Sequence, residues 1–265
     1  MMKPIAKVIG ITVVCLIVFA TIGLLALYPV NVDSLEREFE PHTAKEFEVM
    51  GAFPIDSERY IEYEGAVDAN GTVYFYQQSS EGEGYVTERY EENGTVYIQI
   101  ETSKTESYFV EREKGLFEGE IIQQKEVGDR LVTTIYANES DRSVEQSIRT
   151  REYIINHGLG QLDYDQQYSN DSTISYIPQD GWYSHDNVTG DYRVTGATGE
   201  IQVDAETNYV VNADIEFVRT HATSYLSYIL SDDASFKIAI SYDVNIGPTA
   251  IDTPEWVEEV RSDES

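Results

Sequence analysis

The stretch Tyr209-Val-Val-Asn-Ala-Asp-Ile-Glu-Phe217 and the later stretch Phe236-Lys-Ile-Ala-Ile-Ser-Tyr-Asp-Val244 decide the fold class. In both stretches apolar residues alternate with polar ones, and successive side chains of a β-strand point to opposite faces of a sheet. Two such segments close in sequence predict an antiparallel sheet with one wet face and one apolar face. The candidate apolar sheet face comprises Tyr209, Val211, Ile215, Phe217, Phe236, Ile238, Ile240 and Tyr242.

Short segments of the same alternating kind, separated by turn residues, extend outward from this pair. They predict strands at about 60–67, 72–78, 84–91, 95–101, 106–112, 117–127 and 130–137, and at about 172–177, 191–196, 199–204, 208–219, 223–231 and 234–245. Two Asn-Gly pairs, at 70–71 and 93–94, are typical hairpin turns. One helix is predicted at about 141–156, ended by Gly158 and Gly160.

A long antiparallel sheet must cover its apolar face with a second sheet, a helix, a closed barrel or an apolar ligand. The sequence offers only one or two helices for this purpose. We therefore expect a mainly β (α+β) fold, built as a curved antiparallel half-barrel that encloses the 141–156 helix. A β-sandwich is the alternative.

An uncharged apolar run extends from Val8 to Tyr28. At about 1.5 Å per residue, a helix of this length crosses the roughly 30 Å hydrocarbon core of a bilayer. Lys3 and Lys7 precede the run and acidic residues follow it, so the positive-inside rule predicts a cytoplasmic N-terminus and a domain outside the cell. A cleaved signal peptide is the competing interpretation, but the run is longer than is usual for one.

These features predict five parts of the chain. Residues 1–7 form a cytoplasmic N-terminus, 8–28 a transmembrane anchor, 29–59 a connector, 60–247 an extracytoplasmic β-rich domain and 248–265 an acidic C-terminal tail. Five Asn-x-Ser/Thr sequons agree with the outside location and are candidate N-glycosylation sites. They are Asn70, Asn93, Asn138, Asn170 and Asn187.

The chain is strongly acidic, with 48 carboxylates against 18 basic residues and a net charge of -30. Such a charge repels nucleic acid, so a nucleic-acid partner is excluded. Its 20 Tyr and 9 Phe provide the apolar surface for a folded core. Because concentrated salt screens the self-repulsion of so many carboxylates, the composition favours a halophilic protein. The sole cysteine, Cys15, lies in the apolar run, which leaves the domain without a disulfide.

No set of residues forms a catalytic motif. The histidines His42, His157, His185 and His221 lack the spacing of a zinc site, and no nucleophile elbow or phosphate-binding glycine loop is present. Carboxylate pairs such as Asp232 and Asp233 do not match a calcium loop. We therefore expect a protein that is not an enzyme and that needs no cofactor or metal.

The C-terminal third carries a family resemblance. It runs from Tyr192-Arg-Val-Thr-Gly-Ala-Thr-Gly-Glu-Ile-Gln-Val-Asp204 to Ile251-Asp-Thr-Pro254 and Trp256. These residues resemble the secreted or lipoprotein-type domains of haloarchaea that look like the bacterial LolA and LppX/LprG lipoprotein-carrier half-barrel. The chain departs from that pattern in lacking a lipobox cysteine. The resemblance implies a half-barrel with a lipid or a lipid-modified protein as its partner.

Two functions follow as expectations. The first is a membrane-anchored, non-enzymatic envelope protein that binds a lipid, another apolar ligand or a lipid-modified protein on its concave sheet face. The alternative is a structural or adhesive cell-surface glycoprotein without a ligand cavity, favoured by the five sequons.

Overall fold

The computed structural model describes residues 14–21, 23, 33–34, 39, 41–54, 59–138, 140–169, 172–184, 191–222, 224–230 and 235–263. Among these residues no helix is both long and apolar enough to cross a membrane. Of the predicted span 8–28, only residues 14–21 and 23 belong to the described part, where they are helical. The rest of that span lies outside it.

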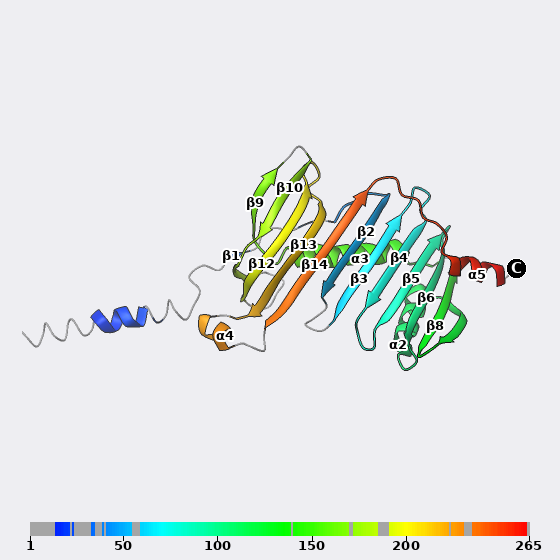
Figure 1. Ribbon diagram of the computed structural model, residues 1–265, viewed down its shortest axis with the longest axis horizontal. Helices are drawn as coiled ribbons and strands as arrows, with labels where there is room; N and C mark the ends of the chain where they lie inside the picture. Colours follow the sequence, from blue (N-terminus) through cyan, green and yellow to red (C-terminus); the bar gives the residue numbers. More distant parts are fainter. Residues whose placement is uncertain are drawn as a thin grey trace, which may run out of the picture.

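The described strands form a single sheet of 14 strands (Figure 1). Its order is β1-β11-β12-β13-β14-β2-β3-β4-β5-β6-β8-β7, and the β9–β10 hairpin joins through β10 to β12. All pairs are antiparallel except β1, which runs parallel to β11. The strands are β1 (Asp33–Ser34), β2 (Phe47–Pro54), β3 (Tyr60–Val67), β4 (Val73–Ser79), β5 (Tyr85–Glu92), β6 (Thr95–Ser103), β7 (Glu120–Val127), β8 (Arg130–Asn138), β9 (Tyr164–Ser169), β10 (Thr173–Pro178), β11 (Gly181–Ser184), β12 (Asp191–Asp204), β13 (Val210–His221) and β14 (Ser235–Ile246).

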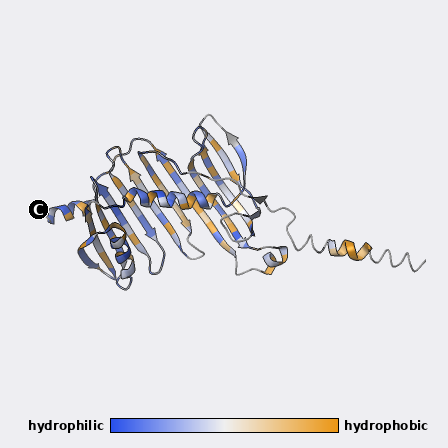
Figure 2. Ribbon diagram, turned by 180° about the vertical axis from the view of Figure 1, so that it is seen from behind, coloured by the Kyte–Doolittle hydropathy of each residue, from blue (hydrophilic) through white to orange (hydrophobic). Residues whose placement is uncertain are grey.

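The mainly β class is thus confirmed, as one open sheet with a few helices. The sandwich alternative is wrong for the described residues, because their strands do not divide into two sheets. The helices are α2 (Ser107–Phe117), α3 (Val144–Leu159), α4 (Tyr225–Leu230) and α5 (Glu255–Asp263). Figure 2 shows that α3 crosses the strands on one face of the sheet.

Close packing of α3 on the sheet depends on glycines in the central strands. A Cβ atom at Gly65 would lie 2.8 Å from Cδ1 of Ile148, and one at Gly51 would lie 2.7 Å from Cδ1 of Ile155. Both isoleucines are fully buried. The helix therefore approaches the strand backbone more closely than any larger residue in these positions would permit.

Six predicted segments differ from the structure. The segment predicted as a strand at 106–112 belongs to α2, and most of the one at 223–231 belongs to α4. The predicted strands 191–196 and 199–204 form one strand, β12, with an irregularity between Thr195 and Thr198. Strand β2 lies within the predicted connector 29–59, where it pairs with β14 and β3. Helix α5 lies within the predicted tail 248–265.

Helix α5 covers part of the sheet face opposite to α3. Val257 and Val260 pack with Tyr90 and Tyr97 in a small hydrophobic cluster separate from the main core. The indole Nε1 of Trp256 donates a hydrogen bond of 2.7 Å to Oε2 of Glu88. The C-terminal residues up to Asp263 are therefore part of the fold.

Candidate ligand-binding site

The predicted apolar face lies under α3. Ile215, Phe217, Ile238, Ile240 and Tyr242 are buried in the main core. Val211 and Phe236 are partly buried against it. The side chain of Tyr209 lies just before β13, and its hydroxyl is 3.1 Å from Oγ1 of Thr43.

Helix α3 covers part of this face at β14 and continues over β4 and β5. Val144, Ile148, Ile155 and Leu159 are fully buried between the helix and the sheet. Beyond the last turns of α3 the filling is incomplete, and a hollow of about 200 Å³ remains. It is lined by Phe53, Pro54, Ile154, His157, Gly158, Gln161, Arg219, Phe236, Ile238 and Ile240. We call it the Arg219 hollow.

The one cationic side chain in the Arg219 hollow comes from β13. Arg219 follows Ile215 and Phe217 at the two-residue period of the strand, so it points to the same face as they do. Its cross-strand partner is Phe236, and its guanidinium carbon lies 4.5 Å from the centre of that ring. Its Nη1 donates to Oε1 of Gln161.

Arg219 is an incompletely satisfied charge. Its Nε is buried and has no hydrogen-bond partner, and no carboxylate in the described part of the chain pairs with its guanidinium. Burial lowers the pKa of Arg219, an effect that nearby Tyr192 partly opposes. A cation with free donor capacity at the edge of an apolar hollow is suited to an anionic group attached to a hydrocarbon part.

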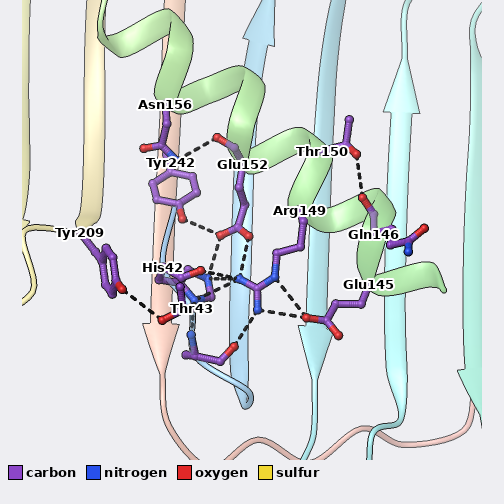
Figure 3. Close-up of polar contacts among 11 residues, drawn as sticks. His42, Thr43, Glu145, Gln146, Arg149, Thr150, Glu152, Asn156, Tyr209 and Tyr242 are labelled. Atoms are coloured by element: carbon purple, nitrogen blue, oxygen red, sulfur yellow. Dashed lines mark hydrogen bonds and ion pairs between the residues drawn. The ribbon is translucent and has the colours of Figure 1, made fainter. Parts of the chain in front are cut away.

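A second polar centre lies nearer the N-terminus of α3, at the buried carboxylate of Glu152 (Figure 3). Its Oε1 lies 2.8 Å from Nε2 of His42 and accepts a 2.8 Å hydrogen bond from the Tyr242 hydroxyl. Its Oε2 lies 3.2 Å from Nη1 of Arg149. The same guanidinium donates to the carbonyl oxygens of His42 at 2.8 Å and of Ala44 at 2.7 Å.

The Glu152 centre holds the fold together. Glu152 and the side chain of His42 have no exposed surface, so no ligand reaches them. Burial, followed by the charge of Glu152, raises the pKa of Tyr242 far above its ordinary value, which keeps that hydroxyl protonated as a donor. The network joins α3 to β14 and to the segment that precedes β2.

The sequence pointed to neither charged centre, although a signal existed for one of them. Arg219 occupies an apolar-face position of the alternating stretch, where an arginine is unusual enough to mark a site. Glu152 gives no such signal, since two of its partners, His42 and Tyr242, lie far from it in the sequence. In the described residues no group of three or more His, Cys, Asp or Glu side chains could hold a metal ion.

Three of the five sequon asparagines belong to the described residues, and all three are exposed. Asn70 lies in the turn between β3 and β4, and Asn138 ends β8. Asn93 and Gly94 form the two-residue loop between β5 and β6, both with positive φ, of 53° and 79°. This loop is the hairpin turn that the Asn-Gly pair predicts. Asn170 and Asn187 lie outside the described residues, as does His185.

Comparison with known proteins adds no further constraint, because no family model matches the chain and no curated protein or solved structure shows significant similarity to it.

Proposed function

We propose that this chain is a membrane-anchored, extracytoplasmic binding protein that takes a small anionic amphiphile into the Arg219 hollow. The segment 8–28 is its anchor, and the sheet domain works outside the cell without enzymatic activity. We retain, as a hypothesis, that the chain is related to the lipoprotein-carrier half-barrels that its C-terminal third resembles. The proposal narrows the expected ligand from a lipid of any kind to one with a single small anionic group.

The observation that carries the proposal is the buried Nε of Arg219, which has no hydrogen-bond partner, beside apolar walls. In a chain with 48 carboxylates, a partly buried arginine that pairs with no carboxylate of the described residues is unexpected unless another anion completes it. The walls from β14 and from the end of α3 are Phe236, Ile238, Ile240 and Ile154. Burial of a short hydrocarbon chain there contributes about 0.8 kcal/mol per methylene group.

The test is calorimetric titration of the full chain, held in non-ionic detergent micelles, with octanoate and with 1-octanol. We expect octanoate to bind the wild-type protein and Arg219→Gln to weaken that binding about tenfold or more, the range for a lost hydrogen bond to a charged group. Octanol, which lacks the anionic group, should bind less tightly and should not distinguish the two proteins.

Two further variants complete the test. Ile154→Trp should block the hollow by volume, while Arg59→Gln removes a surface charge whose ion pair with Glu81 is half exposed and should leave binding unchanged. Since partition of octanoate into micelles is the same for every variant, the differences between variants report on the hollow. Equal octanoate binding by the wild type, Arg219→Gln and Ile154→Trp would refute the proposal.

The exposed sequon asparagines favour a second candidate function, that of a surface glycoprotein. Asn70, Asn93 and Asn138 are all accessible to a glycosyltransferase. If this candidate is correct, protein from its native membrane should migrate faster on gels after enzymatic removal of N-glycans. Replacement of the three asparagines by Gln should abolish part of that shift, and an unchanged mobility would count against it.

A further inference from the structure

A separate pocket opens between α2 and the N-terminal half of α3, over strand β5. Its volume is about 210 Å³. Helix α2 supplies Arg112, Glu113 and Leu116, while β5 supplies Arg89. The start of α3 and the residue before its cap supply the remaining wall, namely Arg142, Ser143, Gln146, Ser147, Thr150 and Arg151.

The charge of this pocket is opposite to that of the whole protein. It brings four guanidinium groups together with a single carboxylate, in a chain whose net charge is -30. Two acidic side chains near the pocket are already hydrogen-bonded or ion-paired. Oε2 of Glu91 accepts hydrogen bonds from Oγ of Ser143 at 2.9 Å and from the backbone N–H of Val144 at 2.6 Å. Glu145 pairs with Arg149 at 3.1 Å.

Arg89 forms the floor of the pocket and has a free donor. The residue is 4% exposed, and its guanidinium lies over the ring of Phe75 at 4.9 Å. Nε and Nη2 both donate to Oε2 of Glu113, at 3.0 and 2.7 Å. Nη1 is buried and has no hydrogen-bond partner. An unsatisfied donor on a buried charge is costly, so an acceptor is missing beside Arg89.

Glu113 cannot neutralise the three arginines around it. It is 1% exposed, and its second oxygen, Oε1, already accepts from Nη2 of Arg112 at 3.2 Å. Arg151 has no carboxylate partner among the described residues, and its Nε donates to the buried Gln77 at 2.9 Å. Burial lowers the pKa of Arg151, Tyr85 and Glu113 oppose this effect, and the charges of Arg89 and Arg112 add to it. The cluster therefore repels itself unless an anion joins it.

We propose that this pocket is a binding site for a phosphate-type oxyanion, with Arg89, Arg112 and Arg151 as its guanidinium ligands. A tetrahedral dianion presents acceptor oxygens in several directions, which suits three arginines held on different elements. One water molecule occupies about 30 Å³ of liquid, so the pocket has room for a phosphate group that carries an organic substituent. The ligand class is a phosphate monoester, with inorganic phosphate as its simplest probe.

The test is a calorimetric titration of the full chain, held in non-ionic micelles, with inorganic phosphate. The dissociation constant is measured at neutral pH and constant ionic strength. Arg151→Gln is the principal variant, because it leaves the buried pair of Arg89 and Glu113 intact and removes only the bond to Gln77. We expect a loss of phosphate affinity of about tenfold or more. Arg59→Gln removes the same charge from a distant surface position and should bind as the wild type does.

A second variant gives a change of opposite sign. Glu113→Gln removes the only carboxylate of the pocket and frees donors on Arg89, so it should bind phosphate more tightly than the wild type. A purely structural role for the arginines does not predict such a gain. Thermal unfolding of each variant without phosphate shows whether the protein is folded before it is titrated.

The outcomes separate this site from the Arg219 hollow, since Arg219→Gln should leave phosphate binding intact and Arg151→Gln should leave octanoate binding intact. The phosphate site is refuted if phosphate does not bind, or if the wild type and Arg151→Gln bind it with equal affinity. It is also refuted if chloride, at the same concentration as phosphate, occupies the pocket equally well. The last result would indicate a general electrostatic attraction without a built site.

Discussion

At the scale of single residues, Glu152 is a fully buried carboxylate that His42, Arg149 and the Tyr242 hydroxyl all contact. Replacement of Glu152 by Ala removes the carboxylate that His42, Arg149 and the Tyr242 hydroxyl share in the core, and Arg149 keeps its bonds to the carbonyl oxygens of His42 and Ala44 and to Glu145. Loss of one partner from a buried charged network costs about 3–5 kcal/mol, so we expect unfolding by urea at a much lower midpoint. Glu145→Gln is the matched control, because it removes the half-exposed partner of the same arginine and should cost at most about 1 kcal/mol.

Asp204 makes one residue-scale contribution to stability that depends on pH. Its Oδ1 accepts hydrogen bonds from the hydroxyl and backbone N–H of Thr207, both at 2.7 Å, and from the N–H of Glu206 at 3.1 Å. These bonds, chiefly those from Thr207, lower its pKa. Because the pKa is lower in the folded state, the contribution is present above the ordinary pKa of an aspartate and disappears as the pH falls through the folded value.

We therefore expect Asp204→Ala to be less stable than the wild type at neutral pH, by about 1 kcal/mol, since the turn is exposed and solvent weakens the effect. The difference between the two proteins should shrink as the pH falls below about 4. The urea midpoints of the wild type and of Asp204→Ala, measured from neutral pH to below about 4, test this expectation. A difference that grows in acid would show that the hydrogen bonds of the turn do not favour the ionised form.

At the scale of secondary-structure elements, the fit of α3 against the sheet depends on the absence of side chains at two strand positions. Gly65→Ala places a methyl group 2.8 Å from Cδ1 and 2.9 Å from Cγ1 of the fully buried Ile148. We expect a loss of about 1–3 kcal/mol from overpacking. Gly115→Ala is the control, because no atom lies within 4 Å of the added carbon and alanine favours a helix. Urea denaturation of both variants compares the two.

The elements also show what local sequence pattern can and cannot predict. Alternation over 209–217 and 236–244 is strong enough to predict β13 and β14 and the direction of their side chains. The segment Ser107–Phe117 alternates over a few residues too, yet it is helical, with Val110, Glu113 and Phe117 buried at helical spacing. This segment packs against β6 and β8. Those contacts favour the helical period over the strand period, and they are not visible in a short window of sequence.

The candidate sites also combine features that local sequence predicts with features that only the fold produces. The orientation of Arg219 follows from strand period alone, whereas its position opposite Phe236 and beside Gln161 depends on strand register and on where α3 ends. Arg89, Arg112 and Arg151 lie on three elements separated in sequence, and nothing in their local surroundings marks them as neighbours. Only the fold brings these arginines into one pocket.

At the scale of the whole molecule, the distribution of charge predicts how stability depends on salt. Carboxylates outnumber basic residues 48 to 18, so most acidic side chains repel one another without a nearby cation. Between 0.1 M and 1 M salt the Debye length falls from about 10 Å to about 3 Å, and repulsion between separate surface carboxylates is largely screened. We expect the midpoint of thermal unfolding to rise steadily over this range of potassium chloride.

Amide substitutions test whether repulsion is the cause. Glu111, Glu120 and Asp214 are exposed, and no ion pair joins them to a cation in the described part of the chain. Their joint replacement by Gln, Gln and Asn should raise the unfolding midpoint in low salt and reduce its further rise in high salt, because there is less repulsion left to screen. An equal rise in both proteins would instead indicate that salt acts through hydrophobic burial, which these three substitutions do not change.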